Sequence, residues 1–344
     1  MNLLMLTNSF HPVIGGVEKH VLRLSQELAA MGHRVTVVSQ RMKPEWPAEE
    51  TLGEVEVRRL PHRPGLGALR SLLRPLLAWA DIAHAHDAYA LLRWCLPLRW
   101  IAPRRPTFIT FHGYEAYPIP LQARMLRRVA ERVTRGSICM GEFICKWYRT
   151  RCAAVSYGGV DLPAGAPDPP ADAGALFVGR LASDSGIVEV IETLRRLRQD
   201  HGFSLALTVC GGGPLRARLE SEAQNAGLDL RFLGPVTDVI PHLLGARYAF
   251  VTGYLSILEA MAHRRLVFAI YDNPLKRDYL EMFPGAGAMV IAGSPEELAR
   301  QVAGHLRAPG RVSALLDQAQ AFAREQTWRR VAEIYLRLWR GGPA

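Results

Sequence analysis

Residues 247–269 read RYAFVTGYLSILEAMAHRRLVFA. An apolar run at 248–251 meets a glycine-containing turn, and a helix-prone segment at 255–262 leads to a second apolar run at 266–270. This order of strand, turn, helix and strand is the building block of a parallel sheet. Glu259 is the one acid of the helical segment, and a carboxylate among apolar residues needs a partner because burying an unpaired charge is costly. A solvent-facing Glu259 is the simpler alternative.

The same alternation runs outward over the whole chain. Apolar runs predict strands at residues 3–6, 34–39, 55–60, 81–85, 107–111, 137–140, 153–157, 175–178, 205–210, 230–233, 248–251, 266–270 and 288–291. Helical patterns lie between several of them, as in 17–31, where the apolar residues recur at helical spacing. Strands alternating with helices predict an α/β fold with doubly wound parallel sheets.

The alternation is interrupted at residues 162–174, which contain four prolines and no apolar periodicity. This composition is typical of a stiff interdomain linker. We therefore expect an N-terminal Rossmann-like domain over 1–161 and a C-terminal Rossmann-like domain over 175–325. A single long final helix is expected near 312–340, with 326–344 packing back toward the first domain. A ligand site is expected between the two sheets, at their carboxyl-end loops.

The net charge of +10 is concentrated in one half of the chain. Residues 1–163 hold 22 Lys and Arg against 13 Asp and Glu, whereas residues 164–344 hold 20 against 19. A basic half attracts phosphates, nucleic acid or anionic lipid, although an arginine-rich composition with solvated side chains explains it equally. A nucleic-acid binder is disfavoured because no known binding module is present.

Five cysteines without CxxC spacing suggest reduced thiols and a cytoplasmic protein. The first residues lack the basic segment of a secretory signal, so none is expected. No uncharged apolar stretch reaches about 18 residues, so no membrane span is expected either.

Several polar or glycine motifs follow predicted strands. Gly15-Gly16 precedes a helix and lets backbone amides approach an anion, although it could be only a tight turn. Arg180 follows the strand at 175–178, where a guanidinium suits a diphosphate or pairs with a nearby acid. His112 follows the strand at 107–111 and either faces the ligand or caps the strand.

Two further motifs argue against other kinds of site, namely the phosphate loops of nucleotide hydrolases or dinucleotide-binding proteins and a metal site. The loop Cys210-Gly-Gly-Gly-Pro214 resembles a phosphate loop, but it lacks the Gly-Lys-Ser/Thr of nucleotide hydrolases and the GxGxxG of dinucleotide sites. His84 and His86 alternate on one strand, but no third ligand at metal spacing is evident. We interpret these two histidines as polar residues at a strand end.

Taken together, the motifs resemble glycosyltransferase family 4, over nearly the whole chain. The matching pieces are GGVE at 15–18, FHG at 111–113, YGGVD at 157–161, FVGRL at 177–181, GGGPL at 211–215, FLGPV at 232–236, LEAMA at 258–262 and Trp328 with VAEIYL at 331–336. The resemblance implies the GT-B fold, in which two Rossmann-like doubly wound parallel-sheet domains face a central cleft.

The resemblance also implies site residues. Gly15, Gly16 and Arg180 would hold the diphosphate of a UDP- or GDP-linked sugar, and Glu259 would bind the ribose. Gly253, Tyr254 and Leu255 would line the same donor site, and His112 would contact the sugar near its reacting carbon. Retention of anomeric configuration is implied, without a cofactor or metal, and the absence of a DxD motif agrees with this. Cations and helix ends would stabilise the leaving group.

The sequence departs from the family at two positions. Ser185 stands where the family usually has a lysine, and Val251 or Thr252 stands where it usually has a first glutamate. Arg264, Arg265 and Lys276 are candidates to replace the missing cation. The missing glutamate suggests an altered donor sugar or a loss of catalysis.

The acceptor side is expected in the basic first domain. Residues 63–79, 89–101 and 121–135 mix arginines with leucine and tryptophan, which suits either an anionic membrane surface or a helix face packed on the sheet. The expected partners are a nucleotide sugar, a glycan or lipid-linked acceptor and the inner face of the membrane.

The sequence therefore predicts a retaining glycosyltransferase of cell-envelope glycan, glycolipid or polysaccharide biosynthesis. Two alternatives stay open. One is an epimerase or hydrolase acting on nucleotide sugars with the same fold, and the other is a catalytically impaired member that binds a nucleotide or a partner.

Overall fold

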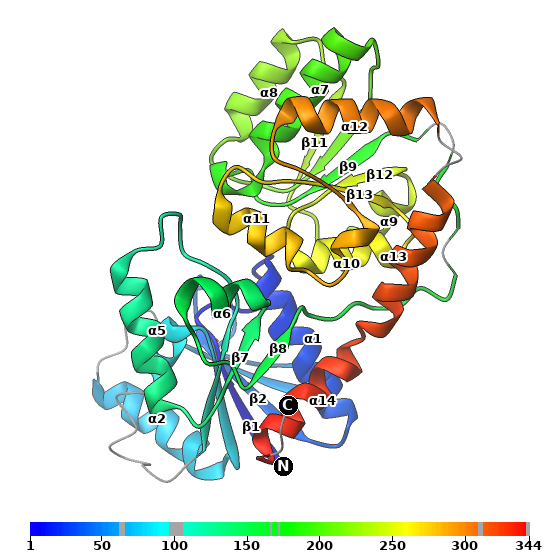
Figure 1. Ribbon diagram of the computed structural model, residues 1–344. Helices are drawn as coiled ribbons and strands as arrows, with labels where there is room; N and C mark the ends of the chain where they lie inside the picture. Colours follow the sequence, from blue (N-terminus) through cyan, green and yellow to red (C-terminus); the bar gives the residue numbers. More distant parts are fainter. Residues whose placement is uncertain (62–65, 96–105, 166, 171–172, 309–311, 342–344) are drawn as a thin grey trace. The chain divides into compact units, whose positions relative to one another are not determined.

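The structure is a computed structural model that describes residues 1–61, 66–95, 106–165, 167–170, 173–308 and 312–341. The chain divides into two compact units. Unit 1 comprises Met1–Gly158 and Trp328–Ala344, and unit 2 comprises Gly159–Thr327. In each unit, strands form the centre and helices pack around them (Figure 1).

Unit 1 contains a sheet of eight strands among the described residues, in the order β3-β4-β2-β1-β5-β6-β7-β8. The strands are β1 (Asn2–Leu6), β2 (Arg34–Gln40), β3 (Glu49–Leu52), β4 (Val55–Leu60), β5 (Ile82–His86), β6 (Thr107–Phe111), β7 (Ser137–Met140) and β8 (Ala154–Ser156). The helices are α1 (Gly16–Ala30), α2 (Leu66–Trp79), α3 (Ala88–Ala90), η1 (Leu91–Cys95), α5 (Leu121–Val133), α6 (Glu142–Tyr148) and α14 (Trp328–Trp339). The strand order reverses between β1 and β5, which is where α/β sheets bind ligands.

In its described residues, unit 2 contains a six-stranded parallel sheet in the order β11-β10-β9-β12-β13-β14. Its strands are β9 (Ala175–Val178), β10 (Leu207–Cys210), β11 (Leu230–Gly234), β12 (Tyr248–Phe250), β13 (Leu266–Ile270) and β14 (Val290–Ala292). Its helices are η2 (Ser183–Ser185), α7 (Ile187–His201), α8 (Arg216–Asn225), α9 (Ile240–Leu244), α10 (Tyr254–Ala262), α11 (Pro274–Glu281), η3 (Ala286–Ala288), α12 (Pro295–Arg307) and α13 (Ser313–Glu325). Here the order reverses between β9 and β12.

The central strands are buried on both faces because helices cover both sides of each sheet. Leu3, Leu4 and Met5 of β1 are fully enclosed, as are Phe250 of β12 and Phe268 of β13. Strands of this kind appear in the sequence as continuous apolar runs, which is why the parallel strands were predictable. The two α/β sheets agree with the predicted fold class.

Two details differ from the prediction. The antiparallel edge strand β3 was missed, because its sequence EETL carries two acids and no apolar run. The single final helix was wrong: it ends at Glu325 and a new helix begins at Trp328. At the break, Val160 and Thr327 form a bridge, and Val160 N donates to Gln326 O at 2.8 Å. Gln326 and Thr327 therefore make strand-like contacts with Val160 in place of continuing the helix.

The proline-rich segment 162–174 lies within unit 2, and the chain passes between the units at Gly158–Gly159 and Thr327–Trp328. In the described part of the chain, no helix is both long and apolar enough to cross a membrane.

Candidate functional site

The carboxyl ends of β9, β12 and β13 are neighbours in the unit 2 sheet, so the loops that follow them meet at one edge. These loops bring Arg180, the Asp184–Gly186 turn, Thr252 and Lys276 into the same part of unit 2. Because the sequence only orders these segments along the chain, their convergence comes from the strand order.

Arg180 lies directly beyond β9 and is exposed, and its Nη2 donates to the Asp184 carboxylate at 2.6 Å. The glycines after β10 support this loop. A Cβ on Gly211 would lie 1.8 Å from the Gly179 oxygen, and one on Gly213 would lie 2.4 Å from the Leu181 oxygen. The triple glycine therefore lets the backbone around Arg180 pack closely against the neighbouring loop.

Lys276 lies beside the turn in which Ser185 replaces the lysine usual in the resembling family. Its Nζ donates to the Asp184 backbone oxygen at 2.6 Å, while Thr252 Oγ1 donates to the Ser185 oxygen at 3.0 Å. The Asn273 side chain caps α11 by accepting from Lys276 N at 2.9 Å, which fixes the first turn of that helix. The Lys276 side chain is buried, and burial lowers the pKa of its ammonium.

The other two candidate cations lie at the opposite end of β13, ahead of its first residue. Arg264 has a φ of 58° and pairs with the carboxylates of Asp168 and Asp317. Arg265 is fully enclosed and donates to the backbone oxygens of Pro167, Leu243 and Leu244. Both arginines therefore hold the proline-rich segment against the rest of unit 2. Neither side chain reaches the carboxyl edge of the sheet.

The helix α10 carries the remaining candidate donor residues of unit 2. Gly253 is its N-cap residue and is exposed, and Leu255 in its first turn is partly exposed. Tyr254 is buried: its ring stacks on Tyr279 at 4.1 Å between centroids, and its hydroxyl donates to the Tyr279 oxygen. Glu259 is also buried, at 7% exposure, so the solvent-facing alternative is wrong.

The missing first glutamate is not replaced by another acid at its position. Val251 is buried, and the Thr252 hydroxyl is bonded to the Ser185 turn. Neither offers a carboxylate to a sugar hydroxyl.

In unit 1, the loop after β1 reaches α1 through Gly15 and Gly16. Gly15 is the N-cap and Gly16 is the first helical residue. The Glu18 carboxylate lies over Gly15, only 2.2 Å from where a Cβ would be, while no atom lies within 4 Å of one on Gly16. Because β1, β5 and β6 are adjacent, this loop shares its sheet edge with His112.

His112 is partly buried and is held by His86, the last residue of β5, and by Asp87, which follows it. Its ring Nε2 lies 2.8 Å from His86 Nδ1, and its backbone N donates to Asp87 Oδ1 at 2.9 Å. Burial and the nearby Arg127 cation lower the pKa of His112 to about 3. The imidazole is therefore neutral near neutral pH, so it can make hydrogen bonds without carrying charge.

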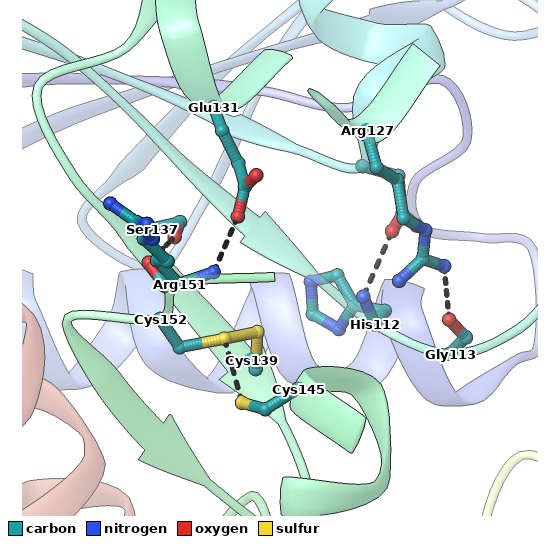
Figure 2. The surroundings of a disulfide bond; sticks show 10 residues. His112, Gly113, Arg127, Glu131, Ser137, Cys139, Cys145, Arg151 and Cys152 are labelled. Carbon is teal, nitrogen blue, oxygen red and sulfur yellow. Dashed lines mark hydrogen bonds between the residues drawn. A yellow bond between two sulfur atoms is a disulfide. The ribbon is translucent and has the colours of Figure 1, made fainter. Parts of the chain in front are cut away.

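Arg127 belongs to the segment 121–135, for which the sequence left open either a membrane surface or packing on the sheet, and Arg127 itself is buried. Its side chain donates to the Gly113 oxygen (Figure 2). It also pairs with the Glu115 carboxylate at 3.2 Å. Its guanidinium lies 3.7 Å from the centre of the Tyr148 ring. Arg127 thus fixes the loop that follows His112.

A network of buried aromatic and polar groups lies behind His112, and few sequence motifs pointed to it. Trp339 Nε1 donates to His84 Nδ1 at 3.0 Å, and His84 Nε2 lies 2.8 Å from Thr110 Oγ1. Thr110 and Tyr335 hydroxyls are 2.8 Å apart, and Tyr335 reaches His20 Nε2 at 3.0 Å. The interpretation of His84 and His86 as polar strand-end residues was therefore incomplete, since both are enclosed and help join α14 to β5.

The helical spacing of α1 could have placed His20 on its buried face beside Val21 and Leu24. Nothing comparable pointed to Tyr335 or Trp339, which lie more than 200 residues away from their partners Thr110 and His84.

The expectation of reduced thiols is contradicted at one pair. Cys139 of β7 and Cys152 form a disulfide, as Figure 2 shows. Their Cα atoms are 5.9 Å apart. The short helix α6 returns the chain beside β7 and so joins residues 13 apart without a recognisable motif. Cys145 Sγ donates to Cys152 Sγ at 3.2 Å. Among the described residues, these three sulfurs form the grouping close enough for a metal, but the disulfide already uses two of them.

Comparison with known proteins agrees with this architecture. Residues 14–162 match the model of Glycosyltransferase Family 4, and residues 167–324 match Glycosyl transferases group 1. A search of curated proteins gave no match.

Solved structures are similar over almost the full length. A sucrose-phosphate synthase from Thermosynechococcus elongatus is 16% identical, with 99% of this chain and 98% of that chain covered and a TM-score of 0.74. HepE from Anabaena in complex with UDP is 16% identical, with 99% and 100% covered and a TM-score of 0.75. WaaG, a glycosyltransferase involved in lipopolysaccharide biosynthesis, is 16% identical, with 99% and 100% covered and a TM-score of 0.67.

At these identities the structures establish the fold, while the two family matches establish the enzyme class. The chain belongs to glycosyltransferase family 4 and has the GT-B fold.

Proposed function

We propose that this chain is a retaining, metal-independent glycosyltransferase that moves a sugar from a UDP- or GDP-linked donor to an acceptor hydroxyl in cell-envelope glycan, glycolipid or polysaccharide biosynthesis. The observation that carries the proposal is the convergence of Arg180 and Lys276 on the Asp184–Gly186 turn. Two cations at the carboxyl edge of a parallel sheet suit a diphosphate whose charge grows as the sugar leaves.

In this proposal Lys276 supplies the positive charge that Ser185 lacks. Its Nζ has three donor positions, of which the bond to the Asp184 oxygen uses one. The lowered pKa reflects burial, and a bound diphosphate would favour the charged ammonium. Of the three candidate cations, Lys276 is favoured because Arg264 and Arg265 are engaged with the proline-rich segment.

The remaining roles follow the family resemblance. Gly15 and Gly16 would present backbone amides to the diphosphate, Gly253, Tyr254 and Leu255 would support the donor from α10, and Glu259 would accept from the ribose hydroxyls. His112 would donate or accept a hydrogen bond at the sugar. The UDP complex of Anabaena HepE, and a second one with UDP-glucose, support a nucleotide-sugar donor by analogy of fold.

The donor experiment compares three proteins. Wild type is screened by thermal shift against UDP, GDP and their sugars, because a ligand bound to the folded state raises the melting temperature. Lys276→Met should lower kcat about 100-fold, because it removes one of the positive charges that stabilise the leaving diphosphate. Arg264→Met, at the other end of β13, is the matched control and should keep turnover. Equal turnover in Lys276→Met and wild type would contradict the role of Lys276.

The missing carboxylate at 251–252 suggests a donor sugar with one hydroxyl absent or carrying an acetamido group. A panel of such donors, with product configuration read by NMR, tests both the sugar and the retention of configuration. Release of free sugar without an acceptor would favour the hydrolase alternative, whereas nucleotide binding without any product would favour the impaired member.

We also propose that α5 contacts an anionic membrane surface. Leu121, Met125 and Val129 recur every fourth residue and are 72%, 58% and 42% exposed. The exposed arginines Arg124, Arg128 and Arg132 lie on the same helix. A helix that buries alanines and exposes its large apolar residues beside arginines suits a membrane surface.

Vesicle flotation tests this surface. Wild type should float with phosphatidylglycerol vesicles and less with phosphatidylcholine vesicles. The double variant Met125→Ser/Val129→Ser should lose flotation, whereas Leu244→Ser, an exposed leucine of unit 2, is the control. Wild type that stays in the soluble fraction at low salt would count against membrane contact.

A further inference from the structure

We propose that the dipeptide His86–Asp87 positions His112, and that His86 keeps the proton of the His112 ring on Nδ1. His112 then presents an N–H donor to its ligand. The inference rests on the proposed contact between His112 and the donor sugar, and it adds the identity of the atom that makes the contact.

The two ring nitrogens of His112 have different surroundings. Nε2 lies 2.8 Å from His86 Nδ1, so that nitrogen is engaged within unit 1. Nδ1 has no hydrogen-bond partner among the described residues, and the side chain is only partly buried. Nδ1 is therefore the nitrogen left to meet a ligand.

One proton lies between His86 Nδ1 and His112 Nε2, and it belongs to one ring or the other. The far nitrogen of His86, Nε2, is enclosed and has no hydrogen-bond partner in the described part of the chain. If His112 donated, His86 would need its proton on that Nε2, leaving an enclosed N–H without an acceptor. If His86 donates, Nε2 carries only a lone pair. Orphaned N–H groups are rarer in protein interiors than unsatisfied acceptors. The second arrangement is therefore favoured.

A neighbouring histidine shows how strongly such contacts select a proton position. Trp339 Nε1 can only donate, and it points at His84 Nδ1, so the proton of His84 must be on Nε2, where Thr110 accepts it. The ring centroids of His84 and His86 are 5.2 Å apart. The rings around His112 are thus held by packing as well as by hydrogen bonds.

Neither His86 nor His112 carries two protons near neutral pH, so one of the two arrangements must hold. Burial lowers the pKa of His20, His84 and His86 well below the usual histidine value, and His112 follows the same direction. All four rings are neutral near neutral pH, so each carries one proton.

Asp87 supplies the second half of the positioning. Its carboxylate accepts the backbone N–H of His112 at 2.9 Å, and its own φ of 71° lies in the left-handed region that non-glycine residues avoid. A strained backbone persists only where its surroundings hold it, and such positions gather at functional sites. The end of β5 therefore holds the His112 ring through His86, and the residue after the strand, Asp87, holds the His112 backbone.

A donor at Nδ1 has consequences for what His112 can bind. It suits an oxygen that accepts, such as a sugar hydroxyl, a carbonyl or a phosphate oxygen, and it disfavours proton abstraction by that nitrogen. The neutral donor also lets the ring approach a diphosphate sugar without depending on imidazolium formation.

The direct test is NMR of wild-type protein carrying isotope-labelled histidine, with His112→Gln to assign the signal. We expect a protonated Nδ1 and a bare Nε2 for His112. A protonated Nε2 would overturn the inference whether or not the protein is an active transferase. This readout needs no substrate, so it fails or succeeds separately from the proposed function.

Two variants test the role of His86 in turnover. In His86→Asn the amide nitrogen can take the place of Nδ1 and keep the donor, so the proton position and kcat should be close to wild type. In His86→Leu the donor is lost; the His112 ring should populate both proton positions, and kcat should fall about tenfold or more, with KM for the donor changing less. Equal kcat in wild type and a folded His86→Leu would refute the positioning role. If His86→Leu does not fold, the wild-type spectrum and His86→Asn decide.

Discussion

Acidification should destabilise unit 1 more than unit 2. Burial keeps His20, His84, His86 and His112 neutral in the folded state by lowering their pKa values, that of His112 to about 3. In the unfolded chain each ring regains a pKa of about 6.5. Below that value the unfolded state binds more protons than the folded state, so stability falls as the pH falls and is retained above it.

The size of the effect follows from proton counting. Between about pH 7.5 and pH 5.5, each histidine that stays neutral in the folded state lowers the free energy of unfolding by about 1.4 kcal/mol. The four histidines together lower it by about 5 kcal/mol. That approaches the whole stability of many domains, about 5–15 kcal/mol. Asp87 opposes this trend, because burial raises its pKa and the folded state then takes up a proton on acidification. Asp87 reduces the difference in bound protons between the unfolded and folded states by at most one.

Tryptophan fluorescence reports selectively on unit 1, because all seven tryptophans lie in Met1–Gly158 or Trp328–Ala344. Urea unfolding should therefore be followed by fluorescence at about pH 7.5, 6.5 and 5.5. The midpoint should drop steeply below about pH 6.5. His20→Gln keeps a group near the Tyr335 hydroxyl and should reduce the loss by about 1.4 kcal/mol. His11→Gln, an exposed position outside the cluster, is the control.

Equal midpoints at the three pH values would refute the reasoning, because they would mean that the four rings titrate alike in both states. A steep pH dependence that His20→Gln leaves unchanged would show that other groups carry it.

Three further outcomes follow from particular contacts. Gly211→Ala places a methyl group against a backbone oxygen of the Arg180 loop, so stability of unit 2 should fall by about 3 kcal/mol, measured by urea unfolding followed by circular dichroism. Arg265→Met leaves three backbone carbonyl oxygens, one of them in a buried hydrogen bond, without their side-chain donor and should lower stability by about 3 kcal/mol, whereas a change below about 0.5 kcal/mol would contradict a structural role. Removing the disulfide by the Cys139→Ser variant should cost about 3 kcal/mol for a loop of this length. Oxidised glutathione should then join Cys145 to Cys152, and peptide mapping that finds both thiols free would contradict their proximity.

The parts of this protein that could be predicted are those that depend on short-range sequence patterns, such as apolar runs and motifs at strand ends. Continuous apolar runs revealed the parallel strands because buried strands need apolar side chains on both faces. Edge strand β3 was missed because none of its side chains is buried, so it has no apolar run. The helix break at Gln326 was missed because it depends on Val160, far away in the chain. The motifs also placed Arg180 and His112 at the ends of strands, where the structure has them.

Choosing among Arg264, Arg265 and Lys276 required the tertiary structure. All three are cations in adjacent segments, but β13 separates them, so two lie at its amino end and Lys276 lies beyond its carboxyl end. Arg127 illustrates the same point. Its helix carries several arginines, and only packing shows which one is buried against Tyr148.

The sequence by itself determined the fold class, the order of the elements and the family, because periodicity, glycine turns and strand-end residues are local properties of the chain. The tertiary structure alone decided which loops meet and which polar groups become buried. These include the disulfide, the histidine network behind His112 and the lysine beside the Ser185 turn. Each depends on strand order and long-range packing, which bring together residues that no local pattern connects.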